Sequence, residues 1–209
     1  MREIIVIGGG GHAKVVMSVL KKCRYHVVGY ADMWGRGAVL GVAYLGDDGV
    51  LAELAKTHEH CGAIVGVGKI DASSFRIRLQ ERISALGFAF PVVVSPRAVV
   101  NEEVDLGAGT VVFDGAVVNS GTVTGSCCIL NTNCTVEHDC RLGENVHIAP
   151  AAALSGGVTI GANSMIGTGT VVMQNIVVCA GCLIGAGSAV VRDIEVPGTY
   201  AGCPARRIG

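Results

Sequence analysis

The second half of the chain repeats with a period of six residues, and this repeat restricts the possible folds more than any other feature. When residues 99–194 are divided into sextets that begin at Val99, every second position except Thr124 is aliphatic. Every sixth position is small or β-branched. This period matches neither the 3.6-residue repeat of a helix nor the alternation of a simple strand. The pattern therefore predicts two inward-facing positions in each sextet.

A parallel β-helix with a triangular cross-section has this period. Each sextet forms one flat face, and three sextets close one coil. Glycine and asparagine are frequent in the third to fifth positions, where they permit the tight backbone of a corner. We therefore expect the repeat to wind into a stack of about five coils.

A different pattern precedes the repeat. Apolar runs typical of strands occupy residues 3–7, 26–31 and 63–68. Helices are predicted over residues 14–22, 49–57 and 74–86. This order predicts a small parallel α/β unit, about half of a doubly wound, Rossmann-like domain. We predict three parts: a small α/β domain over residues 1–92, an all-β parallel β-helix over residues 93–196 and a C-terminal tail over residues 197–209.

A glycine-rich turn follows the first predicted strand. Residues 8–13 read G-x-G-x-x-A, and Asp32 follows about twenty residues later, as in a dinucleotide-binding fingerprint. A glycine turn that opens a helix offers backbone N–H groups and a positive dipole to an anion. Because the α/β unit is too small for a full dinucleotide domain, a mononucleotide or nucleotide-sugar is favoured over NAD. A glycine turn without a ligand is the alternative.

Composition limits the class of partner. Sixteen Lys and Arg oppose 17 Asp and Glu, for a net charge of −1, so no general attraction to nucleic acid or to an anionic membrane is expected. Residues 145–191 carry no charged side chain, but polar residues such as Asn145 and Gln174 interrupt every apolar window too early for a membrane span. The N-terminal residues do not resemble a secretory signal. We expect a soluble, cytoplasmic protein.

The nine cysteines are expected to be mainly small core residues. Cys128, Cys134 and Cys140 all fall at the inward sixth position, where other sextets have Thr, Ala or Val. Cys179 and Cys182 have the spacing of a redox motif, but one is predicted to face outward and the other inward. We therefore favour packing over a functional thiol.

Two of the six histidines fall inside the repeat. His138 takes the fourth position of its sextet, near an accessible corner, and Asp139 follows it. A carboxylate on one ring nitrogen makes the other more basic, which suits a general base; a solvated surface histidine is the alternative. His147 lies half a coil further, so the two imidazoles do not converge on a metal that needs about three ligands. No metal is expected.

These motifs together resemble a known family. They comprise the glycine turn at residues 8–12, the hexapeptide repeat, Asn-Thr-Asn and Val-Glu-His-Asp-Cys within residues 131–140, His-Ile-Ala-Pro at residues 147–150 and the segment at residues 196–205. The chain resembles the sugar acyltransferases related to sialic-acid O-acetyltransferase. It is most similar to the nucleotide-linked amino-sugar N-acetyltransferases of bacterial glycan synthesis. The resemblance covers nearly the whole chain and implies a left-handed β-helix, a homotrimer and acetyl-CoA in the groove between neighbours.

The same resemblance implies roles for particular residues. His138 would be the catalytic base, and Asp139, often Glu in relatives, would tune it. His147 would contact the thioester end of acetyl-CoA, and the backbone N–H of Gly156 would stabilise the oxyanion. Two further residues would line the pantetheine path, namely Thr168 and Ala186. Six residues would hold the nucleotide-sugar: Gly10, Gly11, His12, Asp32, Gly68 and Lys69.

The expected reaction is therefore transfer of acetyl from acetyl-CoA to the 4-amino group of a nucleotide-linked amino-deoxysugar. A neutral amine attacks the thioester directly, so no acyl-enzyme is needed. O-acetylation of a sugar hydroxyl is the second hypothesis. A third, from another class, is a non-catalytic β-helix that serves as a binding module. The residues leave open which sugar is used and whether the nucleotide is UDP or GDP.

Overall fold

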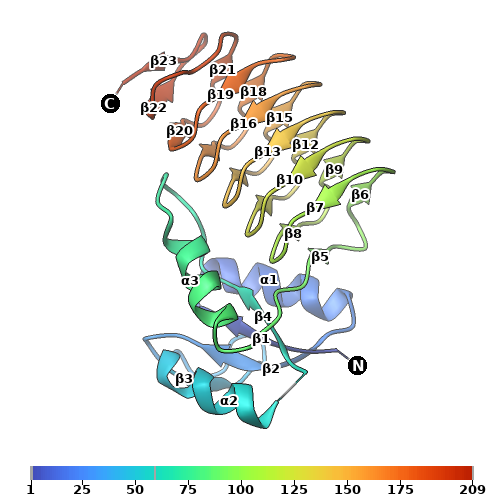
Figure 1. Ribbon diagram of the computed structural model, residues 1–209, viewed down its shortest axis with the longest axis vertical. Helices are drawn as coiled ribbons and strands as arrows, with labels where there is room; N and C mark the ends of the chain where they lie inside the picture. Colours follow the sequence, from blue (N-terminus) through green and yellow to red (C-terminus); the bar gives the residue numbers. More distant parts are fainter. Residues whose placement is uncertain (1, 59, 209) are drawn as a thin grey trace.

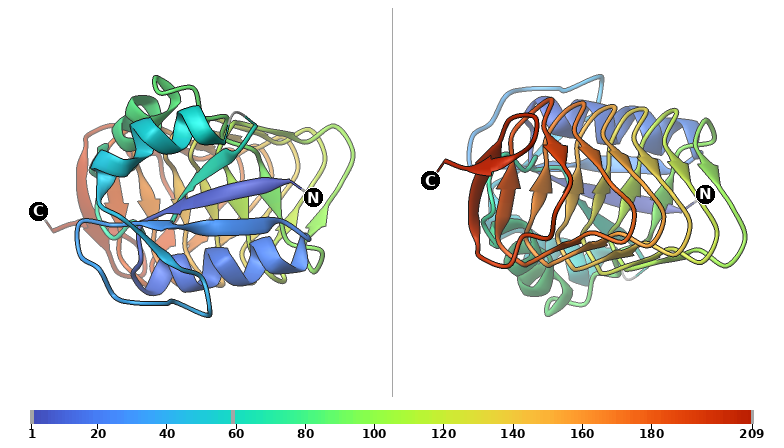
Figure 2. Two further views of the ribbon diagram at one scale, coloured as in Figure 1. Left: turned by 90° about the horizontal axis from the view of Figure 1, so that it is seen from below. Right: turned by 90° about the horizontal axis from the view of Figure 1, so that it is seen from above.

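The computed structural model describes residues 2–58 and 60–208. An α/β domain lies against one side of a long β-helix (Figure 1). Figure 2 shows the same arrangement along two other directions, with the sheet of the α/β domain lying across the coils. The architecture is the expected one: a small α/β domain followed by a left-handed parallel β-helix.

The α/β domain contains four parallel strands in the order β3-β2-β1-β4. Its elements, in chain order, are β1 (Glu3–Ile7), α1 (Gly11–Lys22), β2 (His26–Ala31), β3 (Tyr44–Gly46), η1 (Asp48–Val50), α2 (Leu51–Thr57), β4 (Gly62–Val65) and α3 (Phe75–Ser84). Strands β1 and β2 have the predicted limits. Strand β4 ends at Val65 rather than at residue 68, and residues 66–68 instead line a pocket. The short strand β3 has no alternating pattern and was not predicted.

Helix α1 starts three residues earlier than its apolar spacing indicated, directly after the glycine turn. Gly8 has a φ of +113°, a left-handed conformation that favours glycine. Gly10 is extended and precedes the first helical residue, Gly11. The N-terminal N–H groups of a twelve-residue helix therefore point toward the glycine turn, as the sequence predicted.

The strands of the β-helix form three parallel sheets, which we name faces one, two and three. Face one contains β5 (Val93–Val94), β8 (Val111–Val112), β11 (Ile129–Leu130), β14 (His147–Ile148), β17 (Met165–Ile166), β20 (Cys182–Ile184) and, at its end, β22 (Gly198–Ala201) and β23 (Arg206–Arg207). Face two contains β6 (Val99–Val100), β9 (Val117–Val118), β12 (Thr135–Val136), β15 (Ala153–Leu154), β18 (Val171–Val172) and β21 (Ala189–Val190). Face three contains β7 (Asp105–Leu106), β10 (Val123–Thr124), β13 (Arg141–Leu142), β16 (Thr159–Ile160) and β19 (Val177–Val178).

Equivalent residues of neighbouring coils are 18 positions apart, as in the hydrogen bond between Asn101 and Asn119. The second and sixth positions of the sextets fill the interior, where Val136, Cys140 and Ile148 are fully buried together. The fifth position of each corner has a positive φ, for example 60° at Asp139. The predicted inward positions are thus confirmed.

The α/β domain covers face one. Outward side chains of that face, Val111 and Ile129 among them, pack in one cluster with Ile4 and Val6 of β1. Residues 198–201 of the expected tail pair with β20, and β23 turns back on β22. Among the described helices, none has the length and apolar character needed to cross a membrane.

Candidate active site

His138 and Asp139 form a pair at the corner between β12 on face two and β13 on face three. Nδ1 of His138 lies 2.8 Å from Oδ2 of Asp139. The two side chains are 64% and 72% exposed. The carboxylate orients the ring through Nδ1, which leaves Nε2 to exchange a proton with a substrate.

Gly156 lies next to this imidazole in the following coil. The N–H of Gly157 donates to the carbonyl of His138, which fixes the stacking of the two corners. A Cβ atom placed on Gly156 would lie only 2.5 Å from Nε2 of His138. The ring therefore fits against the backbone of this corner because residue 156 has no side chain.

A pocket above the glycine turn gathers five of the six residues expected to bind the nucleotide-sugar. We name it the glycine pocket; its volume is about 370 Å³. Its lining includes Gly10, Gly11, His12, Asp32 and Gly68. Oδ2 of Asp32 accepts the N–H of Gly9 at 2.6 Å, and Oδ1 accepts the N–H of Trp34 at 3.0 Å. Asp32 thus ties the glycine turn to the end of β2.

The sixth residue, Lys69, does not line the glycine pocket. Its side chain is buried, and Nζ donates to the carbonyl of Ser73 at 2.8 Å. Burial lowers the pKa of the Lys69 ammonium to about 8. A direct contact between Lys69 and a nucleotide-sugar stays a prediction, because the structure uses this cation within its own loop.

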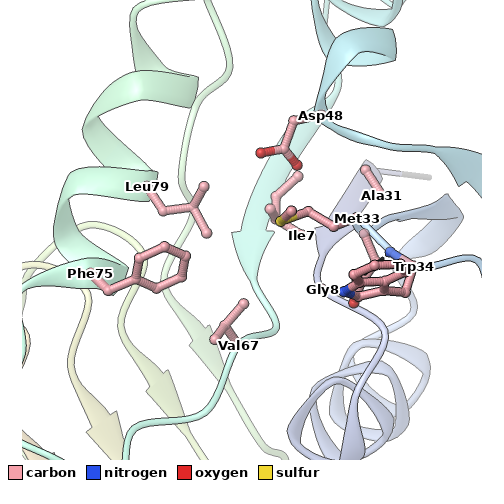
Figure 3. A pocket seen from close by; sticks show the side chains of 10 residues that line it. Ile7, Gly8, Ala31, Met33, Trp34, Asp48, Val67, Phe75 and Leu79 are labelled. Atoms are coloured by element: carbon pink, nitrogen blue, oxygen red, sulfur yellow. Dashed lines mark hydrogen bonds between the residues drawn. The ribbon is translucent and has the colours of Figure 1, made fainter.

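A second, apolar pocket of about 190 Å³ adjoins the glycine pocket and shares Gly8, Asp32 and Val67 with it (Figure 3). Met33 and Trp34 lie at its edge, 73% and 71% exposed, opposite Phe75 and Leu79 of α3. Sequence reasoning missed these residues. The available signal was a large aromatic residue directly after Asp32, at the carboxyl end of a parallel strand where ligands commonly bind.

His147 lies between the two domains and is only 6% exposed. Its Nδ1 is 2.9 Å from the carbonyl of Lys69, which can only accept, so Nδ1 carries the proton. Nε2 then accepts from the Nδ2 amide of Asn131 at 3.0 Å. Burial lowers the pKa of His147 to about 4, so this imidazole is neutral at pH 7. The expected contact with a thioester stays a prediction.

His12 has a similar environment at the domain interface. Its ring meets the ring of Phe113 edge-on, with centroids 5.5 Å apart. Nε2 is buried and has no hydrogen-bond partner within the part of the chain that the structure describes. Burial, with the charge of Arg76 and His147 as smaller causes, lowers the pKa of His12 to about 3. His12 is therefore neutral at pH 7.

Thr168 and Ala186 are exposed at the corner between faces one and two, joined by a hydrogen bond from the N–H of Gly187 to the carbonyl of Thr168. This is a different edge from the corner of His138. The glycine pocket belongs to the domain on face one, whereas His138 lies on the edge between faces two and three. A single chain therefore does not bring the three groups of predicted site residues together.

Cys128, Cys134 and Cys140 are core residues, as the sequence predicted. Burial raises the pKa of Cys128 and Cys134 to about 12, and both thiols are fully buried. The thiols of Cys179 and Cys182 form a hydrogen bond, with the sulfurs 3.5 Å apart, and do not form a disulfide. Within residues 2–58 and 60–208, no three His, Cys, Asp or Glu side chains are arranged to hold a metal ion.

Comparison with known proteins agrees with this architecture. The family model described as the PglD N-terminal domain matches residues 3–83. The acetyltransferase domain of PglB from Neisseria gonorrhoeae FA1090 is 38% identical, with 100% of both chains covered and a TM-score of 0.93. PerB from Caulobacter crescentus, solved with CoA and GDP-perosamine, is 36% identical over 100% of this chain and 98% of its own, with a TM-score of 0.93.

WeeI from Acinetobacter baumannii AYE is a more distant match, 25% identical over 100% of both chains with a TM-score of 0.87. The PglB domain has also been solved in complex with acetyl coenzyme A. No curated protein sequence matches the chain.

Proposed function

This chain belongs to the nucleotide amino-sugar N-acetyltransferases of bacterial glycan synthesis, and on that premise we propose that it acetylates the 4-amino group of a nucleotide-linked amino-deoxysugar. Acetyl-CoA is the donor. The observation that carries the proposal is the exposed pair of His138 and Asp139 beside the backbone of Gly156. A non-catalytic module has no need of such an arrangement.

In the proposed reaction, His138 acts as the general base. The neutral sugar amine attacks the thioester carbonyl, a C–N bond forms, and Nε2 of His138 takes the proton that the nitrogen loses. The C–S bond then breaks, and the proton passes to the CoA thiolate. Asp139 keeps the proton of the neutral imidazole on Nδ1 and stabilises the imidazolium that forms.

The backbone N–H of Gly156 is the proposed donor to the oxyanion. A backbone donor on a rigid coil needs no reorganisation when negative charge develops on the carbonyl oxygen. Gly156 is close to Nε2, so the base and this donor can act on the same reacting centre. Thr168 and Ala186 are proposed to line the path of the pantetheine arm.

The nucleotide-sugar is proposed to occupy the two adjoining pockets of the α/β domain. The glycine turn and the N-terminus of α1 suit the diphosphate, because both present backbone N–H groups to an anion. The apolar pocket beside Trp34 and Phe75 suits the nucleobase, since an aromatic side chain can stack on the nucleobase of either UDP or GDP. The structure of PerB with GDP-perosamine supports a nucleotide-sugar as the acceptor.

We propose a homotrimer in which a neighbouring copy completes each site. Within one chain, His138 and the glycine pocket lie on different sides of the β-helix. Face two also presents an apolar outer surface, where Val99 and Val171 are 50% and 52% exposed. A three-fold arrangement that packs this surface against another copy would bring His138 of one subunit to the pocket of the next.

A mass-spectrometric screen tests the proposed reaction. The enzyme is incubated with acetyl-CoA and matched UDP- and GDP-linked sugars that carry either an amine or a hydroxyl at carbon 4. The proposal predicts the gain of one acetyl group on an amino sugar only. Acetylation of the hydroxyl sugars would show an O-acetyltransferase instead. The absence of both products, together with no CoA binding by calorimetry, would indicate a binding module.

A further inference from the structure

The loop between β4 and α3, residues 66–74, forms a wall of the glycine pocket. Gly66, Val67, Gly68 and Ile70 all line that pocket. The tip is open to solvent, since Ile70 is 84% exposed. A loop with this exposure needs fixed points to keep a pocket in one shape.

The β-helix supplies two of those fixed points from neighbouring residues at the start of β14. His147 donates its Nδ1–H to the carbonyl of Lys69 at 2.9 Å. Asn145, which is fully buried, donates from Nδ2 to the carbonyl of Ser73 at 2.9 Å. The ammonium of Lys69 donates to the same carbonyl of Ser73.

A third anchor comes from α3. The guanidinium of Arg76 is 2% exposed, donates to the carbonyl of Val67, and reaches the carbonyl of Cys127 in the β-helix at 3.4 Å. Side chains thus donate hydrogen bonds to three carbonyls of the loop, those of Val67, Lys69 and Ser73. Because a buried acceptor that loses its donor is costly, the loop is set by the β-helix rather than by the α/β domain alone.

We propose that His147 is a positioning residue for the acceptor: through its Nδ1–H it holds the β4–α3 loop in the shape that binds the nucleotide-sugar, and Asn145 holds the same loop independently. This inference rests on the proposed function, because the glycine pocket must be the acceptor site. It differs from a contact between His147 and the thioester, which would use Nε2 on the side of Asn131.

Two substitutions of His147 distinguish the role of Nδ1 from that of Nε2. In His147→Asn, the amide nitrogen takes the place of Nδ1 and can still donate to the carbonyl of Lys69. In His147→Gln, the amide group reaches the place of Nε2 and leaves that carbonyl without its donor. Both variants are assayed with GDP-perosamine and with a UDP-linked 4-amino sugar, and the KM values for sugar and for acetyl-CoA are measured separately.

We expect His147→Gln to raise the KM for the sugar about tenfold, as for the loss of one buried hydrogen bond. The KM of His147→Gln for acetyl-CoA stays within about twofold, and the KM of His147→Asn for the sugar stays close to that of wild type. If both variants instead lose kcat alike and the KM for acetyl-CoA rises, His147 acts at the thioester and the proposal is overturned. An unchanged sugar KM in His147→Gln overturns it as well.

Hydrogen–deuterium exchange tests the hold on the loop without any substrate. His147→Gln and Asn145→Ala should each speed exchange in peptides that cover residues 66–74, with the coils and the oligomeric state unchanged. The matched control is Asn163→Gly, which removes an acceptor of Asn145 but no contact to the loop. Unchanged exchange in both variants overturns the proposal. A wild-type enzyme that acetylates no sugar overturns only the proposed function, since this measurement still decides the hold on the loop.

Discussion

Three histidines of this chain occupy environments that give them different chemistry. His138 is exposed and paired with a carboxylate. His12 and His147 are buried at the domain interface, where desolvation favours the neutral ring. The same side chain can therefore move a proton at one position and hold a loop through a fixed N–H at another.

The buried pair predicts a loss of stability in mild acid. The pKa of His12 falls from 6.5 to about 3 and that of His147 from 6.5 to about 4 on folding. The unfolded chain therefore binds protons first as the pH falls below 6.5. The stabilisation that comes from the neutral rings is fully present above pH 6.5. It decreases as the pH falls toward about 4 for His147 and about 3 for His12, and the loss at pH 5 is about 2 kcal/mol per histidine.

Urea unfolding at pH 7 and pH 5 measures this loss. His12→Asn removes one titrating ring, so its free energy of unfolding should change less between the two pH values than that of wild type. His26→Asn, at an exposed position, is the control and should keep the wild-type difference. Equal pH dependence in His12→Asn and wild type would show that burial of His12 is not the cause.

Gly156→Ala tests the contact between the backbone and the base. The new Cβ would lie 2.5 Å from Nε2 of His138, so the imidazole must move away from its productive position. We expect kcat to fall at least about tenfold, with a melting temperature close to wild type. Gln174→Ala, on the same edge one coil further, is the control. A fully active Gly156→Ala enzyme would show that the imidazole can shift without loss.

At the scale of elements, the corners of the β-helix determine the backbone. The fifth position of the sextets is left-handed, and most of these positions hold glycine, asparagine or aspartate. Ala151 is an exception, with a φ of 56°. A left-handed conformation is unfavourable for alanine by about 1 kcal/mol or more. The stacking of the coils imposes this conformation on Ala151.

Ala151→Gly should therefore stabilise the protein by about 1 kcal/mol, or about 2–4 °C in melting temperature for a chain of this size. Calorimetry measures the shift. Ala162→Gly, at a corner position without a positive φ, should instead lower the melting temperature, because glycine gains more freedom in the unfolded chain. A destabilised Ala151→Gly variant would contradict this interpretation of the corner.

The sequence predicted the repeat to the residue because burial inside the prism depends only on position within a sextet. It did not show that face one is covered, which decides the environment of His147. The signal was present but spread over every third sextet: Val111, Ile129, Met165 and Leu183 all point outward from face one. Similarly, the hydrogen bond from Nζ of Lys69 to the carbonyl of Ser73 depends on the path of a loop. A periodic sequence pattern gives no information about that path.

At the scale of the molecule, one chain places His138 and the glycine pocket on different sides of the β-helix. In the proposed shared site, His138→Ala and Gly11→Glu would each inactivate one half, the second by placing a negative charge in the glycine pocket, where the diphosphate is proposed to bind. Each variant alone should be inactive. Mixed oligomers assembled from equal amounts should regain about a quarter of wild-type activity, because a quarter of the proposed shared sites would combine two intact halves.

The mixing experiment also has a clear opposite result. If each chain contains a complete site, every subunit in the mixture carries one defect and no activity returns. Native mass spectrometry of the mixture, with one of the two variants isotope-labelled, shows whether exchange of subunits has occurred. Both groups of candidate residues could be predicted from the sequence, but their separation within one chain is seen only in the three-dimensional arrangement.

The turnover of His138→Ala tests the central claim most directly. The measurement is kcat for acetyl transfer to the amino sugar identified in the screen, with the oligomeric state and melting temperature matched to wild type. General-base catalysis by this imidazole predicts a loss of at least about 100-fold. Near-normal turnover in a correctly assembled His138→Ala enzyme would remove His138 from that role and contradict the proposed mechanism.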